Sequence, residues 1–334
     1  MKAQTYKFFA LSQALSAITH MSGTEGNEGI LMRKPVATPS GEICEVPMLT
    51  GNALRHAIRE VGGKFLIDQL GLSGATDKRP LNFLLHGGDR TEKGRLESLG
   101  RQARMYELFP FLKFFAGSIP QQIMKGMSKV WFGWLVCEET RQIIAKSLPK
   151  GWELDSKILF PAEHFIGSYQ IVRGDVEFSA PEYLAADRPP TPIPSGRKKA
   201  PDDNRAMTSG QSVITGSYFA HGYHLEHAYL RDVGCLLHCL SLWQHSGGRI
   251  GGKSASGHGR LKTQIHIEPE VDIPEAIQAY LDHVAENIEA CQKWLQEAFS
   301  TPVKEEKPKA EKKAKPKATK EVTVVEPAEA SLWQ

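Results

Sequence analysis

Hydrophobic and polar positions change in blocks along the chain, and the first two blocks predict a strand and a loop. The opening stretch TYKFFALSQALSAITHMSG, residues 5–23, is apolar and rich in residues that favour strands. It predicts a buried strand that ends at Gly23. The next stretch, from Ser22 to Pro47, is polar and contains several glycines, which predicts a long loop.

The third block has the spacing of a helix. The stretch GNALRHAIREVGGKFLIDQLG, residues 51–71, predicts a helix that Thr50 or Asn52 can cap. Its inner face is formed by Leu54, Ala57, Ile58 and Val61. This spacing leaves Arg55 and Arg59, four residues apart, on another face.

The middle of the chain alternates between polar and aromatic blocks. Residues 73–104 are mostly polar and predict a surface insertion, whereas residues 108–136 are aromatic and predict core. The aromatic residues of the second block are Phe109, Phe111, Phe114, Phe115, Trp131, Phe132 and Trp134. Residues 183–207 hold four closely spaced prolines followed by three cations from Arg197 on, which predicts a protruding loop.

The last part of the chain alternates between strand and helix patterns. Residues 212–226, SVITGSYFAHGYHLE, predict a strand, and residues 230–245 have helical spacing. Residues 261–267 predict another strand. Residues 273–299 predict one amphipathic helix with Pro274 in its first turn.

Composition predicts a cytoplasmic protein with one domain and a tail. The chain has 334 residues and a formal charge of +3, so total charge does not identify a nucleic-acid binder. No apolar run approaches the roughly 20 residues that span a bilayer, and the five cysteines predict no disulfide framework. Residues 1–300 are expected to form the domain, and the lysine- and glutamate-rich residues 301–334 a disordered tail.

The stretch HSGGRIGGKSASGHGRLK, residues 245–262, carries the main candidate chemistry. Gly247 to Ser254 fits the phosphate loop of ATPases and GTPases, but that loop follows a strand and opens a helix. Here a predicted helix precedes the loop and a predicted strand follows it, which argues against an NTPase. The loop's six glycines are mixed with Arg249, Lys253, His258 and Arg260. This mixture favours a surface that a sugar-phosphate chain can approach, and a tight turn with solvated charges is the alternative.

Four stretches together, in order between residues 5 and 268, resemble the RAMP superfamily of CRISPR-associated proteins. They are LSAITHMSGTEGNEGILMRKPV, EVPMLTGNALRHAIREV with its P-x-x-x-G-x-x-L-[KR] pattern, VITGSYFAHGYHLE and the glycine-rich loop. The resemblance is to the backbone subunit that lines guide RNA in class 1 multi-subunit effector complexes, most like that of type IV systems. It implies an α+β fold: an RRM-like, ferredoxin-type core with helical insertions and a protruding thumb hairpin at about residues 183–212.

The resemblance also implies partners and contact residues. The expected partners are CRISPR guide RNA, the complementary target strand, further copies of this chain arranged head to tail, and other CRISPR effector subunits, for recognition of plasmid or phage DNA. No cofactor and no membrane are expected. The residues expected to contact RNA are His20, Arg33, Lys34, Asn52, Arg55, Arg59, Arg197, Lys198, Lys199, Arg205, Arg249, Gly251, Gly252, Lys253, Ser254, His258 and Arg260. For His20, a structural hydrogen bond is an equal alternative.

Catalysis is not expected. The RNA-cleaving relatives carry an aspartate two residues before a proline in the loop after the first strand, and here LMRKPV places Arg33 at that position. An arginine stays protonated and cannot act as a general base or bind a cation. The alternative is a metal-dependent ribonuclease in which Glu25 or Glu28 substitutes.

The histidines and cysteines between residues 221 and 239 are a weaker candidate, for a metal site. They are His221, His224, His227, Cys235, His238 and Cys239. Their spacing does not match a zinc knuckle or the H-E-x-x-H motif. We therefore expect no metal, with the cysteines packed in a core helix.

Overall fold

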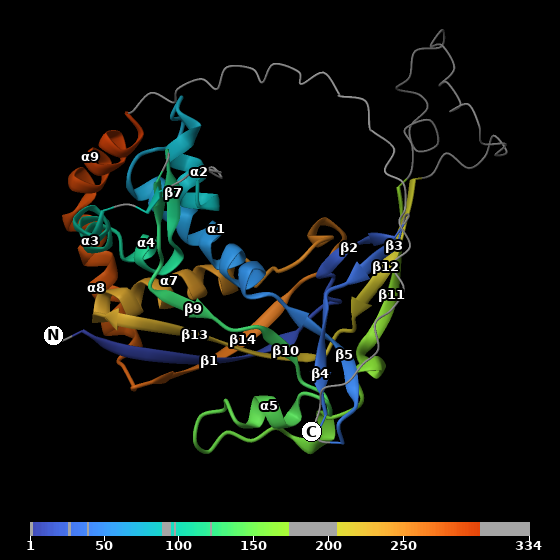
Figure 1. Cartoon of the computed structure of the whole chain (residues 1–334). Helices are drawn as coiled ribbons and strands as arrows, with labels where there is room; N and C mark the ends of the chain where they lie inside the picture. The colour runs from blue at the N-terminus through green and yellow to red at the C-terminus, as the bar shows by residue number, and fades with distance from the viewer. Residues whose placement is uncertain are drawn as a thin grey trace, which may run out of the picture. The chain divides into compact units, whose positions relative to one another are not determined.

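The computed structural model describes residues 3–25, 28–38, 40–88, 95–96, 98–120, 122–173 and 206–300 (Figure 1). All of them belong to one unit, Met1–Thr301. Most of the expected thumb, with Arg197, Lys198, Lys199 and Arg205, lies outside these ranges, as do residues 301–334. No helix in the described ranges is long and apolar enough to cross a membrane.

The fold is mixed α+β, and its largest sheet has the order β14-β1-β13-β10-β5-β4, with β9 also paired to β13. Every pairing in this sheet is antiparallel. Its strands are β1 (Gln4–Ala14), β4 (Arg33–Ala37), β5 (Ile43–Leu49), β9 (Ser128–Val130), β10 (Gly133–Leu135), β13 (Tyr218–Ala228) and β14 (Leu261–Glu268).

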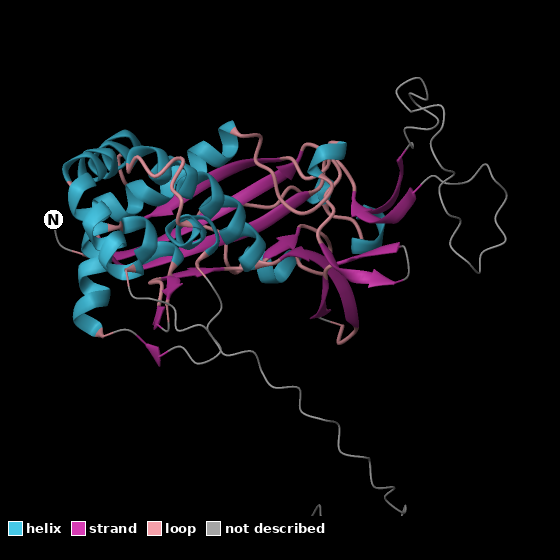
Figure 2. Cartoon of the chain, turned by 90° about the horizontal axis from the view of Figure 1, so that it is seen from above, coloured by secondary structure: helices cyan, strands magenta, loops and turns pink. Residues whose placement is uncertain are grey.

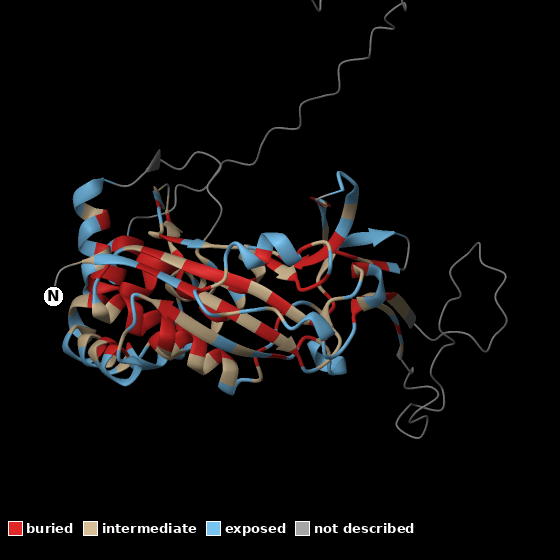
Figure 3. Ribbon diagram, turned by 90° about the horizontal axis from the view of Figure 1, so that it is seen from below, coloured by how far each residue is buried: buried red, intermediate tan, exposed pale blue. Residues whose placement is uncertain are grey.

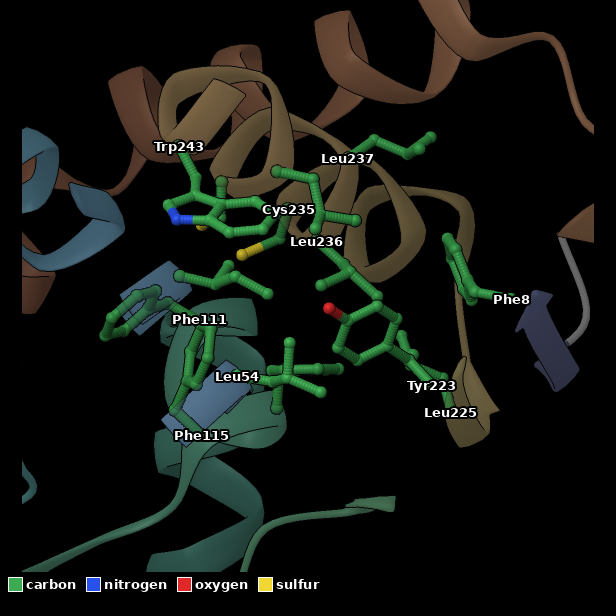
Figure 4. Packing of buried hydrophobic residues seen from close by; sticks show 14 of the residues in the cluster. Phe8, Leu54, Phe111, Phe115, Tyr223, Leu225, Cys235, Leu236, Leu237 and Trp243 are labelled. Carbon is green, nitrogen blue, oxygen red and sulfur yellow. The ribbon is translucent and has the colours of Figure 1, made fainter. Parts of the chain in front are cut away.

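Helices cover one face of this sheet (Figures 1 and 2). They include α1 (Gly51–Gln69), α4 (Pro110–Phe115), α7 (Leu230–His245) and α8 (Ile273–Glu286). Alternate residues of β1, such as Tyr6, Phe8 and Ala10, are buried, and Figure 3 shows this burial along the sheet. Figure 4 shows side chains of α1, α4 and α7 meeting Tyr223 of β13 in the core.

Two smaller sheets complete the described residues. One has the order β11-β12-β3-β2, with β11 (Ile166–Arg173), β12 (Ala206–Val213), β3 (Glu28–Leu31) and β2 (Met21–Glu25). The other contains β6 (Arg95–Leu96), β8 (Gln122–Met124) and β7 (Gly117–Ile119). The remaining helical segments are α2 (Lys78–His86), α3 (Leu99–Leu108), α5 (Arg141–Ala145), α9 (Ile288–Phe299), η1 (Ser156–Ile158), η2 (Ala162–Phe165) and η4 (Ser254–Ser256).

The first strand and the loop after it differ from the prediction. The strand ends at Ala14 rather than at Gly23, and the stretch from Ser22 to Pro47 contains β3, β4 and most of β2 and β5 rather than one loop. These strands are short. Few side chains of β2, β3 and β4 face the core, Leu31 and Val36 among them, whereas the end of β5, from Val46 to Leu49, is buried at every position and does not alternate. A polar sequence with so few buried positions carries little period-two signal.

Three further predictions need correction. The polar residues 73–104 are not only a surface insertion, because α2 places Phe83 and Leu84 fully in the core. Phe132, expected in the core, is 47% exposed. The last amphipathic helix is two helices, α8 and α9, which meet at Asn287.

Candidate nucleic-acid interface

The glycine-rich loop begins with a turn that glycine makes possible. Gly248 has a φ of 60°, and an added Cβ would lie 2.1 Å from the Leu261 carbonyl oxygen. Its amide donates to the carbonyl oxygen of Trp243 at 2.8 Å, while the Trp243 indole Nε1 donates to the Arg249 carbonyl oxygen at 2.8 Å. The end of α7 therefore holds the start of the loop in a fixed conformation.

The same loop is fastened to the segment that follows β1. The Gly252 amide donates to the Thr19 carbonyl oxygen at 2.8 Å, and the Thr19 hydroxyl donates back to the Gly252 carbonyl oxygen at 2.6 Å. The Gly259 amide donates to the Ala17 carbonyl oxygen at 2.9 Å. A Cβ on Gly251 would lie 2.5 Å from the Thr19 carbonyl oxygen, so this close approach requires glycine.

The next residue, His20, ties this segment to the start of α1. Its Nε2 accepts a hydrogen bond from the Thr50 amide at 3.2 Å, and Thr50 is the N-cap whose hydroxyl accepts from Ala53. An accepting Nε2 means a neutral ring, and burial lowers the pKa of His20 in the same direction. Of the two alternatives for His20, the hydrogen-bonded structural one is present.

Two arginines of the loop face each other across a backbone pairing. Arg249 and Arg260 form an isolated antiparallel β-bridge, and both are exposed. Within the described residues, neither forms an ion pair. Among the residues that the structure describes, the positive charge at this bridge is therefore not compensated by a neighbouring acid. Like charges directly opposite each other on paired strands are destabilising.

Lys253 adds a third cation in a strained conformation. Its φ is 62°, in the left-handed region that non-glycine residues rarely adopt, and it precedes the short helix η4. Such strain tends to gather at functional sites. In the glycine-rich loop, Arg249, Ser254 and Arg260 are exposed, and Lys253 is half-buried.

Tyr169, which the sequence did not single out, joins the loop to the β11–β12 hairpin. The Lys253 Nζ lies 5.9 Å from the centre of its ring, and the His258 ring packs edge-on to it at 5.3 Å. Added Cβ atoms on Gly29 and Gly210 would lie 2.9 and 2.8 Å from its hydroxyl oxygen. These two glycines make room for the tyrosine, and their role was not visible without the pairing of β3 with β12.

The other expected contact residues are on β4 and α1. Lys34, on β4, and Asn52, on the first turn of α1, are exposed. The Arg33 Nη2 donates to the Gln211 side-chain oxygen of β12 at 2.7 Å. The half-buried Arg55 donates through its Nη2 to the Ser128 carbonyl oxygen at 3.1 Å.

Arg59 is a correction, because it lies in the core. It is only 5% exposed, and its guanidinium donates to the carbonyl oxygens of Phe83, Leu84 and Phe115. Those carbonyls lie in the last turns of α2 and α4, where a cation is favourable. Burial lowers the pKa of Arg59 to about 9, which leaves it charged at neutral pH. Because each guanidinium nitrogen donates to a carbonyl oxygen in the core, Arg59 is a structural residue rather than an RNA contact.

The histidines and cysteines of the weaker candidate are dispersed. Cys235 and Cys239 are buried in α7, as predicted, while the His221 Nε2 pairs with the Ser12 hydroxyl at 2.8 Å. In the part of the chain that the structure describes, no group of three or more histidine, cysteine, aspartate or glutamate side chains is placed to hold a metal ion.

Comparison with known proteins gives likenesses to solved structures only. No family model matches the chain, and no curated protein matches its sequence. Among solved structures, it is similar to a chain of one described as "Type IV-B CRISPR Complex", with a TM-score of 0.43 and 17% identity over 81% of this chain and 98% of that chain. A likeness of this degree assigns neither a fold nor a function, so the function is argued below from the residues of this chain.

Proposed function

We propose that this chain binds the guide RNA of a CRISPR effector complex as a non-catalytic backbone subunit. The observation that carries the proposal is the facing pair Arg249 and Arg260, both exposed and neither ion-paired within the described residues. A bound phosphate chain would relieve their repulsion. Contacts of this kind ignore base sequence, as a subunit that serves any guide requires.

The position of the loop supports the same function. Residues 17–20 join the glycine-rich loop to the N-terminus of α1, where helix amides attract anions. Exposed Asn52 and Lys34 are on elements attached to this segment, since the Met32 amide before β4 donates to the His20 carbonyl oxygen at 2.7 Å. A backbone with several phosphates can use all of these groups at once, whereas a compact triphosphate cannot.

The topology supports the RRM-like, ferredoxin-type core that the sequence resemblance implies. Along the chain, β1, α1, β9, β13, α7 and β14 follow the β-α-β-β-α-β order of that motif. In the sheet, β14, β1, β13 and β9 are neighbours in that order. The hairpin β11–β12 leads to residues 174–205, which contain the cations expected of a thumb.

The proposal of a non-catalytic role rests on the residue at the position expected of a catalytic aspartate. Arg33 occupies it, and its guanidinium is hydrogen-bonded to Gln211. A guanidinium there can bind phosphate but cannot accept a proton or hold a metal ion. Copies of this chain, a target strand and other effector subunits are its proposed partners.

Charge reversal tests the proposal. In Arg249→Glu/Arg260→Glu, binding of a guide-length RNA is expected to weaken, and the dependence of binding on salt to fall by about 1.4 in log–log slope, since two phosphate contacts are lost at about 0.7 each. The control, Lys157→Glu/Lys293→Glu, reverses two exposed cations on other elements and is expected to bind as the wild type. Unchanged affinity and slope in the first variant would refute the assignment.

A further inference from the structure

The segment that contains α5 lies on the other face of the central sheet from α1 and α7 (Figure 1). A cavity of about 440 Å³ is lined by residues of this segment and of the sheet. It is formed between β1, β13, β9, β10 and the segment around α5. Its aromatic and apolar wall includes Phe9, Trp131, Phe132, Trp134, Ile143 and Trp152. The cavity has no part in the interface built from the glycine-rich loop, and its volume suits one or two large side chains.

The wall of this cavity is held open by fixed contacts. Phe9 packs edge-on against Trp131, with ring centres 5.7 Å apart, and a Cβ on Gly222 would lie 2.5 Å from the Trp131 ring. Phe132 and Ile143 remain 47% and 39% exposed. Large apolar side chains left open to water in a preformed hollow mark a binding site for another apolar group.

The chain itself contains a segment with the matching chemistry. Between residues 301 and 334 there is one aromatic residue, Trp333, and it follows Leu332. Residues 304–320 hold eight lysines, whereas residues 321–334 hold none and carry three glutamates. The segment 321–334 is thus both the apolar and the acidic part of this region.

Charge and length agree with this occupant. Lys146 and Lys150 are exposed, flank the lining residues Ser147 and Leu148, and form no ion pair within the described residues. The sequence of residues 141–152 contains no acid. An extended chain from Ser300 to Trp333 reaches about 110 Å at ~3.4 Å per residue. A folded unit of this size has a radius of gyration of about 19 Å, so the segment can reach any part of its own domain.

We propose that Leu332 and Trp333 dock into this cavity of their own chain. Tethering gives the segment an effective concentration in the millimolar range, which favours its own cavity over that of another copy at ordinary protein concentrations. This inference is independent of the RNA-binding proposal, because it uses no residue of that interface.

The test uses the full chain labelled with 5-fluorotryptophan, in which the Trp333 signal is assigned from Trp333→Phe. The reference is a free peptide of residues 321–334 with the same label. We expect the Trp333 signal of the full chain to differ from the peptide's and to return to it in Ile143→Lys. It should stay displaced in Ile273→Lys, which alters an isoleucine of similar exposure, 46% against 39%, outside the cavity. Added peptide should compete only at about millimolar concentration.

Three outcomes would overturn the proposal. The first is a Trp333 signal that coincides with the free peptide in the wild type. The second is a Trp333 signal that stays displaced from the peptide's in Ile143→Lys while this variant keeps the wild-type melting temperature. A displacement of the Trp333 signal that disappears on dilution counts equally, because it would make a second copy the occupant. The third is a set of cavity tryptophan signals that shift with an added oligonucleotide while Trp333 stays free, which would make a nucleobase the occupant.

Discussion

At the scale of single residues, two features of the glycine-rich loop lower the stability of the unbound protein. Arg249 opposes Arg260, and Lys253 has a left-handed backbone. Each feature costs free energy in the unbound protein, and each could be removed by one substitution. A bound anion would offset both of these costs, which supports the proposal that this loop binds RNA rather than forming only a structural turn.

Arg260→Glu tests this directly, because it places opposite charges across the bridge. The free energy of unfolding is expected to rise by about 0.2–1 kcal/mol, while RNA affinity falls. Chemical denaturation and RNA binding are measured on the same preparation. Lys262→Glu is the matched control, since Lys262 is paired with uncharged Gln13 of β1 and should bring no such gain. Loss of stability in Arg260→Glu relative to this control would contradict the account.

His221 predicts how stability depends on pH. Burial lowers its pKa from 6.5 to about 4, whereas the unfolded chain titrates near the ordinary value. The unfolded state therefore binds the proton first, and the free energy of unfolding falls as pH drops from about 6.5 towards 4. Urea denaturation at several pH values should show this fall, and it should be smaller in His221→Gln. An identical pH dependence in the two proteins would contradict the prediction.

At the scale of elements, the sequence predicted the long segments and missed the short ones. The helix capped by Thr50, the helix of residues 230–245 and the strand from Leu261 were confirmed. In each of them, apolar residues recur at the spacing of a helix or a strand along the element. The strands β2, β3 and β4 were missed because few of their positions are buried. β5 was missed because its buried residues, Val46 to Leu49, are consecutive and do not alternate with polar ones. Arg59 was misplaced because its partners belong to α2 and α4, far along the chain.

The hairpin β11–β12 and the glycine-rich loop are expected to act as a unit through Tyr169. Tyr169→Ala removes the ring that contacts His258 and Lys253, so RNA affinity should fall although no cation is lost. Tyr169→Phe keeps the ring and should bind RNA within about twofold of the wild type, since only a hydroxyl close to Met21 is removed. Equal RNA affinity for both variants and the wild type would show that the contact is only packing.

At the scale of the whole molecule, residues 17–20 connect the glycine-rich loop, the start of α1 and the end of β12. Residues 17–20 hold the glycine-rich loop through Ala17 and Thr19 and the start of α1 through His20, and Ile18 exchanges backbone hydrogen bonds of 2.8 and 2.9 Å with Val213 at the end of β12. The sequence placed the glycine-rich loop, the start of α1 and His20 in the candidate site. Their meeting point could not be predicted, because it depends on hydrogen bonds between residues about 30 to 240 positions apart.

The most direct test of the central claim is the nucleic acid that the protein carries. The full chain is expressed with a repeat-spacer cassette and its neighbouring subunits, purified, and its bound nucleic acid is extracted and sequenced. The account predicts RNA of uniform guide length in a particle that contains several copies of the chain, and loss of that RNA in Arg249→Glu/Arg260→Glu. A nucleic-acid-free monomer from the wild-type preparation would contradict it.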